Sequence, residues 1–354
     1  MVQIVLDLKL PHSYDVHPPL SWVRQHSCSS YLLMPDRRRR QVAGQFIEAS
    51  FTNDAGTRDY KLYVPKRYHG QALPLLVMLH GCTQDPDDFA VGTRMNEIAE
   101  SNSCFVAYPS QAESANKSRC WNWFDELNQQ RDQGEPSIIA GITREVIAQY
   151  HIDVKRVFIA GMSAGGAMAI IMAATYPELF AGVGAHSGMP YKAAQTLYTA
   201  LSAMSRGATT LHPLASAGIP IIVFQGDKDS RVNPRNSEQI LSQWMGSNVS
   251  QTAAGAVTSE TKATNGRVYQ RTIYPDAAGH TAAELWVVEG AGHTWSGGNS
   301  LGSHTDSLGP DASSEMLRFF LGGPQKAVPR RDRRLLRGLV NRCLRALRLK
   351  RTAA

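Results

Sequence analysis

A serine flanked by glycines is the first feature of this chain that could carry out chemistry. Residues 161–166 read Gly-Met-Ser-Ala-Gly-Gly, which is the pattern G-x-S-x-G centred on Ser163. The apolar run 157–160 predicts a strand before it, and the small residues 164–175 predict a helix after it. A serine at such a junction sits on a tight, strained turn that lifts its hydroxyl out of the sheet. We therefore predict that Ser163 is a nucleophile.

A serine hydroxyl needs a base to take its proton and an acid to orient that base. The strand predicted at 285–289 runs into Gly-Ala-Gly-His-Thr-Trp, so His293 stands between small residues just past a strand. The strand predicted at 219–224 is followed by two acids, Asp227 and Asp229. We predict His293 as the general base and Asp229, which is farther along its loop, as the orienting acid. Asp227 is better suited to a turn or a cap.

Negative charge that develops on a substrate oxygen needs backbone N–H donors close to the serine. The buried strand predicted at 75–79 ends in His-Gly-Cys-Thr-Gln, where the glycine allows a close approach of the backbone. We predict that the N–H groups of Cys82 and Ala164 form an oxyanion hole. The side chain of His80 is interpreted as a support for this loop rather than as a catalytic group.

The remaining histidines and cysteines predict no metal site, because their spacings match no zinc pattern. No organic cofactor is predicted either. His280 and His304 lie in the same region as His293, but neither directly follows a predicted strand. We interpret both as surface or loop residues.

The predicted site residues depend on strands and helices that alternate along the chain. Strands are predicted at 59–64, 75–79, 105–108, 157–160, 182–185, 219–224, 268–274 and 285–289, and helices at 137–150, 164–175 and 314–321. This alternation indicates an α/β fold with a mostly parallel sheet covered by helices on both faces. The segment 191–216, rich in Ala, Leu and Met, is expected either to cap the site as a small helical lid or to pack as an ordinary helix.

Composition narrows the class of protein. The chain has 354 residues, and its 43% hydrophobic content supports a folded core and argues against wholesale disorder. No apolar run approaches the roughly 18 residues that span a bilayer, and five cysteines are too few for a disulfide scaffold. The net charge of +7 is concentrated at the ends, whereas residues 44–325 carry a net charge of −6. An acidic body argues against nucleic-acid binding.

The two ends of the chain are predicted to be appendages. Residues 1–43 show no sustained hydrophobic period and include four consecutive arginines, which predicts a flexible extension or a start placed too far upstream. No secretory signal is recognised there. Residues 326–354 carry eleven basic side chains and one acidic one, with leucines at helical spacing. This basic amphipathic pattern indicates contact with an anionic surface or granule, or else a helix packed on its own domain or a disordered tail.

Four motifs, taken together and in this order, resemble the polyhydroxybutyrate (PHB) depolymerase family of esterases. They are residues 80–84 (His-Gly-Cys-Thr-Gln), 120–124 (Cys-Trp-Asn-Trp-Phe), 161–166 and 290–295. The family's members are α/β-hydrolases related to feruloyl and acetylxylan esterases, and the resemblance covers roughly residues 44–322. It implies the α/β-hydrolase fold and a serine esterase, with the family's acid at the position of Asp229.

The Cys-Trp-Asn-Trp segment is the mark that most distinguishes this family. The resemblance implies that Cys82 and Cys120 pair as a disulfide that braces the oxyanion loop. Trp121 and Trp123 are expected to form a flat apolar wall for an acyl chain or polymer, or else to pack one in the core and expose the other. The predicted substrate-binding residues are Trp121, Asn122, Trp123 and Trp295.

The expected partner of the site is an ester, and the expected reaction is its hydrolysis by Ser163, His293 and Asp229. A short-chain polyhydroxyalkanoate, as 3-hydroxybutyrate oligomer or polymer, is the first substrate implied by the resemblance. A feruloyl- or acetylxylan-type carbohydrate esterase is the near alternative, and a non-catalytic granule- or surface-binding protein is the alternative from another class. The resemblance implies an extracellular location, whereas the absence of a recognisable signal in 1–43 leaves a cytoplasmic one open.

Overall fold

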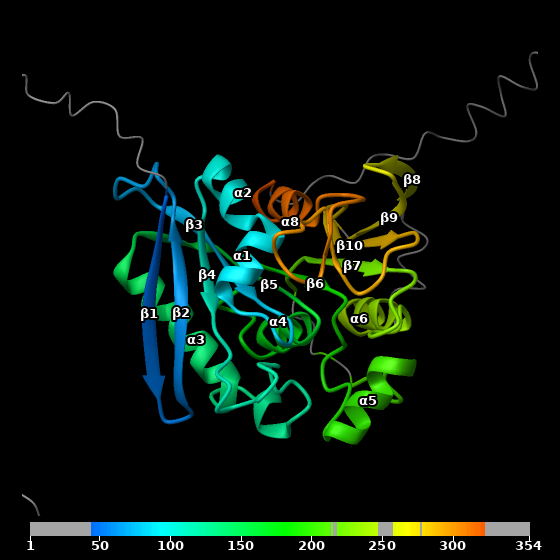
Figure 1. Ribbon diagram of the computed structural model, residues 1–354, viewed down its shortest axis with the longest axis horizontal. Helices are drawn as coiled ribbons and strands as arrows, with labels where there is room; N and C mark the ends of the chain where they lie inside the picture. The colour runs from blue at the N-terminus through cyan, green and yellow to red at the C-terminus, as the bar shows by residue number, and fades with distance from the viewer. Residues whose placement is uncertain (1–43, 213, 215–217, 247–257, 277, 323–354) are drawn as a thin grey trace, which may run out of the picture. The chain divides into compact units, whose positions relative to one another are not determined.

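The computed structural model describes residues 44–212, 214, 218–246, 258–276 and 278–322 (Figure 1). The extension predicted at 1–43 and the tail predicted at 326–354 therefore lie outside the described residues. All described residues belong to a single compact unit. Among them, no helix is both long enough and apolar enough to span a bilayer.

Ten strands of the described chain form one sheet, in the order β1-β2-β4-β3-β5-β6-β7-β10-β9-β8. They are β1 (Gln45–Asn53), β2 (Gly56–Val64), β3 (Leu73–Leu79), β4 (Phe105–Pro109), β5 (Ile152–Met162), β6 (Gly182–His186), β7 (Ile221–Gly226), β8 (Thr258–Thr264), β9 (Arg267–Pro275) and β10 (Thr281–Val288). The six inner strands, from β4 to β10 in the sheet order, pair in parallel, and the outer strands pair antiparallel. This arrangement confirms the predicted mostly parallel sheet.

The inner strands are apolar because helices cover both of their faces. Every residue of β3, β4, β6 and β7 is buried. On β3 the side chains of Leu75, Val77 and Leu79 enter one hydrophobic core, and those of Leu76 and Met78 enter the other. The sheet is thus the middle layer between two cores.

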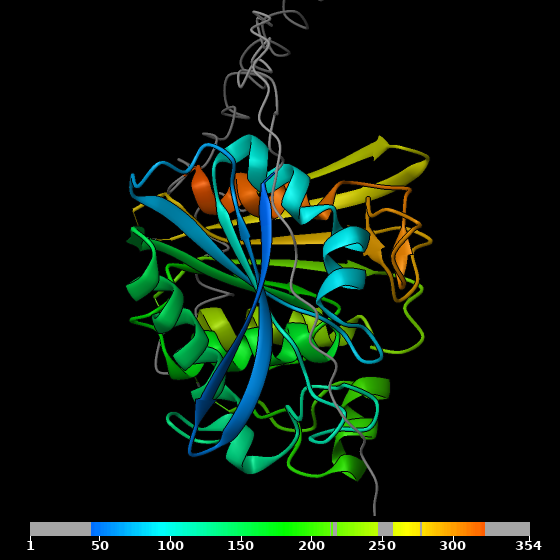
Figure 2. The same ribbon diagram turned by 60° about the vertical axis from the view of Figure 1, so that its left-hand side comes forward.

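The helices lie in two layers, one on each face of the sheet (Figure 2). One layer contains α1 (Pro86–Thr93), α2 (Met95–Asn102) and α8 (Ala312–Leu321), and the other contains α3 (Gly134–Gln149), α4 (Ala164–Thr175) and α6 (Arg235–Met245). The remaining elements are the short helix η1 (Glu126–Gln129), α5 (Leu197–Arg206) and the small sheet of β11 (Trp295–Ser296) and β12 (Thr305–Asp306). Loops that leave the carboxyl ends of β3, β5, β7 and β10 all emerge at one edge of the parallel sheet, where ligands bind in folds of this type.

Candidate active site

Ser163 occupies the turn between β5 and α4, as the G-x-S-x-G pattern predicts. Its backbone has φ 56° and ψ −119°, a conformation that L-residues rarely adopt. The Ser163 N–H donates to the carbonyl of His186 at 2.9 Å, which ties the turn to the end of β6. A Cβ atom added to Gly165 would overlap the carbonyl oxygen of Leu79, so only glycine allows α4 to start this close to β3. The two flanking elements therefore hold Ser163 in a strained position.

Asp229 and His293 are hydrogen-bonded, with Asp229 Oδ2 2.8 Å from His293 Nδ1. The Asp229 carboxylate is wholly buried, and its other oxygen accepts the backbone N–H groups of Arg231 and Val232, each at 2.9 Å. Burial alone would raise the pKa of Asp229, but the bond to His293 and these N–H groups outweigh it, so the pKa is lowered. Because an ionised carboxylate only accepts, Nδ1 of His293 donates and Nε2 is left as the acceptor.

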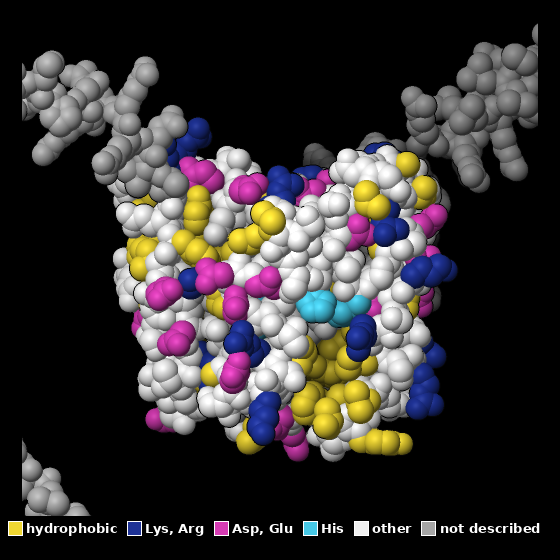
Figure 3. All heavy atoms as spheres, in the orientation of Figure 1, with side chains coloured by type: hydrophobic (Ala, Val, Ile, Leu, Met, Phe, Trp, Pro, Cys, Tyr) yellow, Lys and Arg dark blue, Asp and Glu magenta, His cyan; other side chains and the backbone are white. Residues whose placement is uncertain are grey.

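Ser163 and His293 line the same cavity, which has a volume of about 380 Å³. Its lining residues are Gly81, Cys82, Thr83, Gln84, Met162, Ser163, Met204, Arg231, His293 and His304. Figure 3 shows histidine side chains beside a hollow with a hydrophobic floor, and a Lys or Arg side chain close to them. Within the described residues, no hydrogen bond joins the Ser163 hydroxyl to His293. Such contacts often tighten only when substrate binds.

The loop after β3 brings Cys82 to this cavity and is fixed by a disulfide. Cys82 and Cys120 are joined, with their Cα atoms 4.2 Å apart. The neighbouring Thr83 N–H donates to Ser118 at 2.7 Å, whereas the Cys82 and Ala164 N–H groups donate to no protein acceptor in the described part of the chain. Both N–H groups are therefore free to bind an oxyanion.

His80 holds the start of this loop from beneath. Its ring is buried, Nε2 accepts the backbone N–H of Gln111 at 3.1 Å, and Nδ1 lies 2.7 Å from the carbonyl of Gly81, to which it donates. Burial lowers the pKa of His80 to about 4, so the ring is neutral near pH 7. These contacts support the interpretation of His80 as a structural residue.

A buried carboxylate on α3, Glu135, connects the segments that carry the disulfide. It accepts hydrogen bonds from the Gln111 side chain, from the Asn122 side chain at 2.7 Å and from the Asn122 backbone N–H at 2.8 Å. The Gln111 amide also donates to the carbonyl of Cys120 at 2.9 Å. Burial raises the pKa of Glu135, and these donors oppose that rise. The position of Cys82 thus depends on a polar network that the sequence analysis did not identify.

The four residues predicted to bind substrate do not line this cavity, and we revise their roles. Trp121, Trp123 and Trp295 are each at most 4% exposed, and Asn122 is held by Glu135. Trp121 packs beside His80, with ring centroids 5.7 Å apart, so its indole supports the oxyanion loop from the core. Neither expected arrangement of the Trp121 and Trp123 pair, a surface wall or one exposed ring, occurs in this structure.

His186, at the end of β6, is a further histidine next to the site. Its buried ring stacks on Trp295, with centroids 5.1 Å apart, and its Nε2 accepts the backbone N–H of Ser296 at 3.1 Å. Burial, with a smaller contribution from the charge of His293, lowers the pKa of His186 to about 3. His186 directly follows the strand predicted at 182–185, and this position at a strand end could have identified it as a residue next to the site.

Of the alternative residues considered for the triad, His304 lies at the cavity, whereas His280 and Asp227 do not line it. His304 lines the cavity, with Nε2 3.4 Å from the Thr83 hydroxyl, and so belongs to the site although it does not contact Asp229. His280 lies at the turn between β9 and β10, 3.5 Å from Asp276. Asp227 accepts the N–H of Gly290 at 2.6 Å, in keeping with its predicted turn role. Met204 and Arg231 also line the cavity, and neither was predicted as a site residue.

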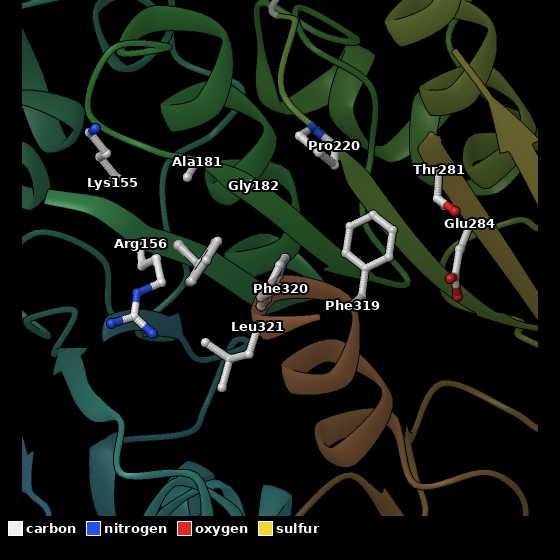
Figure 4. A pocket seen from close by; sticks show the side chains of 11 residues that line it. Lys155, Arg156, Ala181, Gly182, Pro220, Thr281, Glu284, Phe319, Phe320 and Leu321 are labelled. Carbon is white, nitrogen blue, oxygen red and sulfur yellow. The ribbon is translucent and has the colours of Figure 1, made fainter. Parts of the chain in front are cut away.

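A second cavity, of about 210 Å³, lies at the amino ends of the inner strands (Figure 4). It is lined by Lys155, Arg156, Phe158, Ala181, Gly182, Pro220, Thr281, Glu284, Phe319, Phe320 and Leu321. The buried Glu284 carboxylate accepts from Arg271 and Arg318, each at 2.7 Å. Among the described residues, no group of three or more His, Cys, Asp or Glu side chains is placed to hold a metal ion.

Comparisons with known proteins agree with the resemblance seen in the motifs. The chain is 29% identical over 264 residues to poly(3-hydroxyalkanoate) depolymerase C of Paucimonas lemoignei, covering 69% of this chain and 60% of that protein. It is 26% identical over 279 residues to acetylxylan esterase A of Talaromyces purpureogenus, covering 72% of each. This chain therefore spans less than two thirds of the length of the depolymerase.

The fold and the family follow from two further matches. The solved acetyl xylan esterase from Aspergillus awamori superimposes with a TM-score of 0.58 at 23% identity, covering 70% of this chain and 94% of that one, which shows a shared α/β-hydrolase fold. The family model described as "Esterase PHB depolymerase" matches residues 58–267. Because that match spans more than half of the chain, the chain belongs to the PHB depolymerase family of α/β-hydrolase esterases.

Proposed function

We propose that this protein is a serine esterase in which Ser163, His293 and Asp229 act as a catalytic triad. Ser163 Oγ attacks the ester carbonyl carbon while His293 Nε2 takes its proton, and the N–H groups of Cys82 and Ala164 bind the oxyanion. His293 then protonates the departing alcohol, leaving an acyl group on Ser163. Water attacks the acyl carbon, gives its proton to His293, and releases the acid, and the proton returns to Ser163.

One observation carries this proposal. The strained Ser163 and the Asp229–His293 pair come from three separate loops, yet both Ser163 and His293 line the cavity that also contains Cys82. A serine held in this conformation with no catalytic use would be a cost of about 1–3 kcal/mol without compensation.

The test is hydrolysis of p-nitrophenyl butyrate by a Ser163→Ala variant. Loss of the nucleophile should lower kcat by at least about 10⁴-fold, because the remaining groups can only polarise the carbonyl. Ser187→Ala, at a buried serine on the neighbouring strand end, is the matched control and should keep the parent rate. Hydrolysis by Ser163→Ala at the rate of the parent would reject the triad.

We propose a short-chain polyhydroxyalkanoate, as oligomer or amorphous polymer, as the substrate. The named depolymerase relative supports this class. The outer face of α5 supports it too, because Leu197, Tyr198 and Leu201 are 61%, 81% and 58% exposed and Met204 of the same helix lines the cavity. Figure 3 shows hydrophobic side chains gathered there. Exposed apolar groups bury more favourably against an aliphatic polyester than against a hydrated polysaccharide.

An acetylxylan- or feruloyl-type esterase is the second candidate, favoured by the relative from Talaromyces purpureogenus that is covered over 72% of its length. The two candidates differ in the groups that surround the ester. A panel of 3-hydroxybutyrate oligomers, methyl ferulate and acetylated xylan separates them. The proposal expects the highest kcat/KM on the oligomers, and a higher value on acetylated xylan would favour the second candidate.

We also propose that the tail 326–354 attaches the enzyme to an anionic surface. Its eleven basic residues support electrostatic attraction to such a surface. Deleting the tail should leave hydrolysis of a soluble ester unchanged and weaken sedimentation with vesicles that contain anionic lipid. Equal sedimentation of the two forms would remove the surface role.

A further inference from the structure

The arginines of the described chain divide into those that pair with an acid and those that do not. Of the thirteen, nine lie within 4.0 Å of a carboxylate oxygen. The nine are Arg58, Arg94, Arg119, Arg131, Arg144, Arg156, Arg267, Arg271 and Arg318. The four without such a partner among the described residues are Arg67, Arg206, Arg231 and Arg235. Pairing is thus the rule in this acidic body, and its exceptions call for an explanation.

Of the four unpaired arginines, one lines the cavity of the proposed active site and two lie at the adjoining junction of α5 and α6. Arg231 lines the cavity itself. Arg206 ends α5 at a turn that is bonded to the start of α6, since the Asn233 N–H donates to the carbonyl of Met204 at 2.7 Å. Arg235 begins α6 at the same junction. We call Arg206, Arg231 and Arg235 the basic rim.

No acid of the site offsets the basic rim. None of the residues that line the cavity is Asp or Glu. The nearby carboxylates are already engaged, because Asp229 bonds His293 and Asp227 accepts the Gly290 N–H. Glu238, one turn along α6, lies within 4.0 Å of none of the three guanidinium groups. The charge of Arg231 therefore faces the cavity, and the exposed Arg206 and Arg235 add positive charge at the adjoining junction of α5 and α6, where they attract anions.

We propose that the basic rim binds a carboxylate carried by the substrate, so that the site prefers short hydroxyacyl oligomers with a free acid end. This inference rests on the proposed esterase function and names its substrate more closely. A guanidinium is always protonated and grips a carboxylate through two parallel N–H donors. The rim adjoins the apolar face of α5, and α5 carries both Leu201 and Arg206. An aliphatic oligomer with one carboxylate has this same combination of an apolar chain and a single charge.

The test compares two forms of a 3-hydroxybutyrate trimer, the free acid and the uncharged primary amide of its carboxyl end. In the parent enzyme, kcat/KM should be about fivefold higher for the acid, the size expected for one exposed ion pair. Arg231→Gln should bring the acid-to-amide ratio close to one, and Arg231→Lys should keep part of it. Arg67→Gln, at an unpaired and exposed arginine away from the cavity, is the matched control and should leave the ratio as in the parent. Salt at about 0.5 M should shrink the ratio in the parent.

Two results would overturn this inference. One is an acid-to-amide ratio that is the same in the parent and in Arg231→Gln. The other is a preference for acetylated xylo-oligosaccharides that carry a uronic acid over the oligomer acid, which would assign the rim to a different carboxylate. Hydrolysis of p-nitrophenyl butyrate is measured in parallel. If the parent hydrolyses p-nitrophenyl butyrate but the acid-to-amide ratio does not change in Arg231→Gln, only the basic-rim assignment is rejected. If the parent does not hydrolyse p-nitrophenyl butyrate, the esterase function itself is rejected.

Discussion

The two ends of the inner parallel strands each hold a cavity, and they differ in how their groups are satisfied. At the carboxyl end, three lining residues have positive φ, namely Thr83 at 68°, Ser163 at 56° and His304 at 52°. None of the residues that line the cavity at the amino end has a positive φ. There Glu284 is 1% exposed and paired with two arginines, whereas the guanidinium of Arg231 at the carboxyl end has no acid within 4.0 Å in the described chain.

This contrast separates stability from function within one sheet. A strained backbone and unpaired donors persist only where the surrounding structure overdetermines them, and they gather at sites that act on a ligand. At the amino end the side chains of Arg156 and Glu284 are paired with opposite charges, and rings such as those of Phe158 and Phe320 stack with centroids 4.8 Å apart. We expect substitutions at the carboxyl end to change rates and substitutions at the amino end to change the free energy of unfolding.

The largest expected effect comes from the Asp229→Asn variant at the carboxyl end. An amide would present a donor to His293 and favour the wrong tautomer, so kcat should fall by about 10⁴-fold with little change in melting temperature. Asp227→Asn is the control on the same loop, and it should keep most of the activity because Asp227 accepts a turn N–H and lies 3.7 Å from exposed Lys228, with no contact to His293. Equal losses in the two variants would mean that the loop, rather than the Asp229 carboxylate, supports the reaction.

At the amino end, Glu284→Gln should act on stability instead. It removes the charge that Arg271 and Arg318 share, and the expected cost is about 3 kcal/mol of unfolding free energy, measured by denaturant titration. Glu260→Gln is the control, because Glu260 pairs with the same Arg271 at 3.4 Å but is 36% exposed, and it should cost less than about 1 kcal/mol. A fall in kcat of folded Glu284→Gln would break the contrast between the two ends.

Glu135→Gln tests whether the buried network positions the oxyanion donor. Glutamine keeps one acceptor oxygen but turns the other into an NH2 donor, so the three donors from Gln111 and Asn122 can no longer all be satisfied, and kcat should fall by about tenfold while KM is unchanged. Affinity for an alkyl boronic acid, which places an oxyanion in the same hole, should fall in parallel. Glu145→Gln, on the same helix and bonded to Tyr60 at 2.6 Å, is the control for general loosening of α3. Parallel losses in the two variants would refute a positioning role.

The last expected effect concerns pH and the two buried histidines of the carboxyl end, and it is small at any single pH step. The folded pKa values of His80 and His186, about 4 and about 3, lie below the unfolded value, so the unfolded chain binds protons first as the pH falls. Stability is therefore present above about pH 6.5 and is lost as the pH falls toward 4, by about 1.4 kcal/mol per pH unit for each ring. The slope should lessen by that amount in His186→Asn, and an unaltered slope would count against the buried neutral ring.

The triad could be predicted from the sequence because each of its residues lies on the loop that follows an inner strand. Ser163 and His293 also have glycines close to them in the sequence, and such glycine-rich turns can be predicted from local sequence. The sequence analysis does not predict the edge strands β1 and β8. In β8, which reads Thr-Ser-Glu-Thr-Lys-Ala-Thr, there is no apolar run to indicate a strand. Pairing with β9 across a short turn holds this polar strand, and that contact is not visible in composition.

The errors at the site have a different physical cause, because burial and charge pairing are long-range properties. From the sequence alone, Trp121 and Trp123 are predicted to form an apolar wall at the surface. In the structure, contacts with His80 and with residues far away in the sequence bury them. The sequence around Arg231 does not distinguish it from other loop arginines. It stands out only in the structure, because its guanidinium has no acid within 4.0 Å and no Asp or Glu lines the cavity. Glu135 meets Gln111 across 24 positions of sequence, so neither residue signals the network alone.

The most direct test of the account is covalent labelling with diethyl p-nitrophenyl phosphate, followed by intact mass measurement and peptide mapping. We predict one diethylphosphoryl group per chain, located on Ser163 and accompanied by loss of esterase activity, and no labelling of the Ser163→Ala variant. Labelling on another residue with loss of activity, or full activity in an enzyme labelled at Ser163, would contradict the claim that the chemistry takes place at the carboxyl end of the sheet.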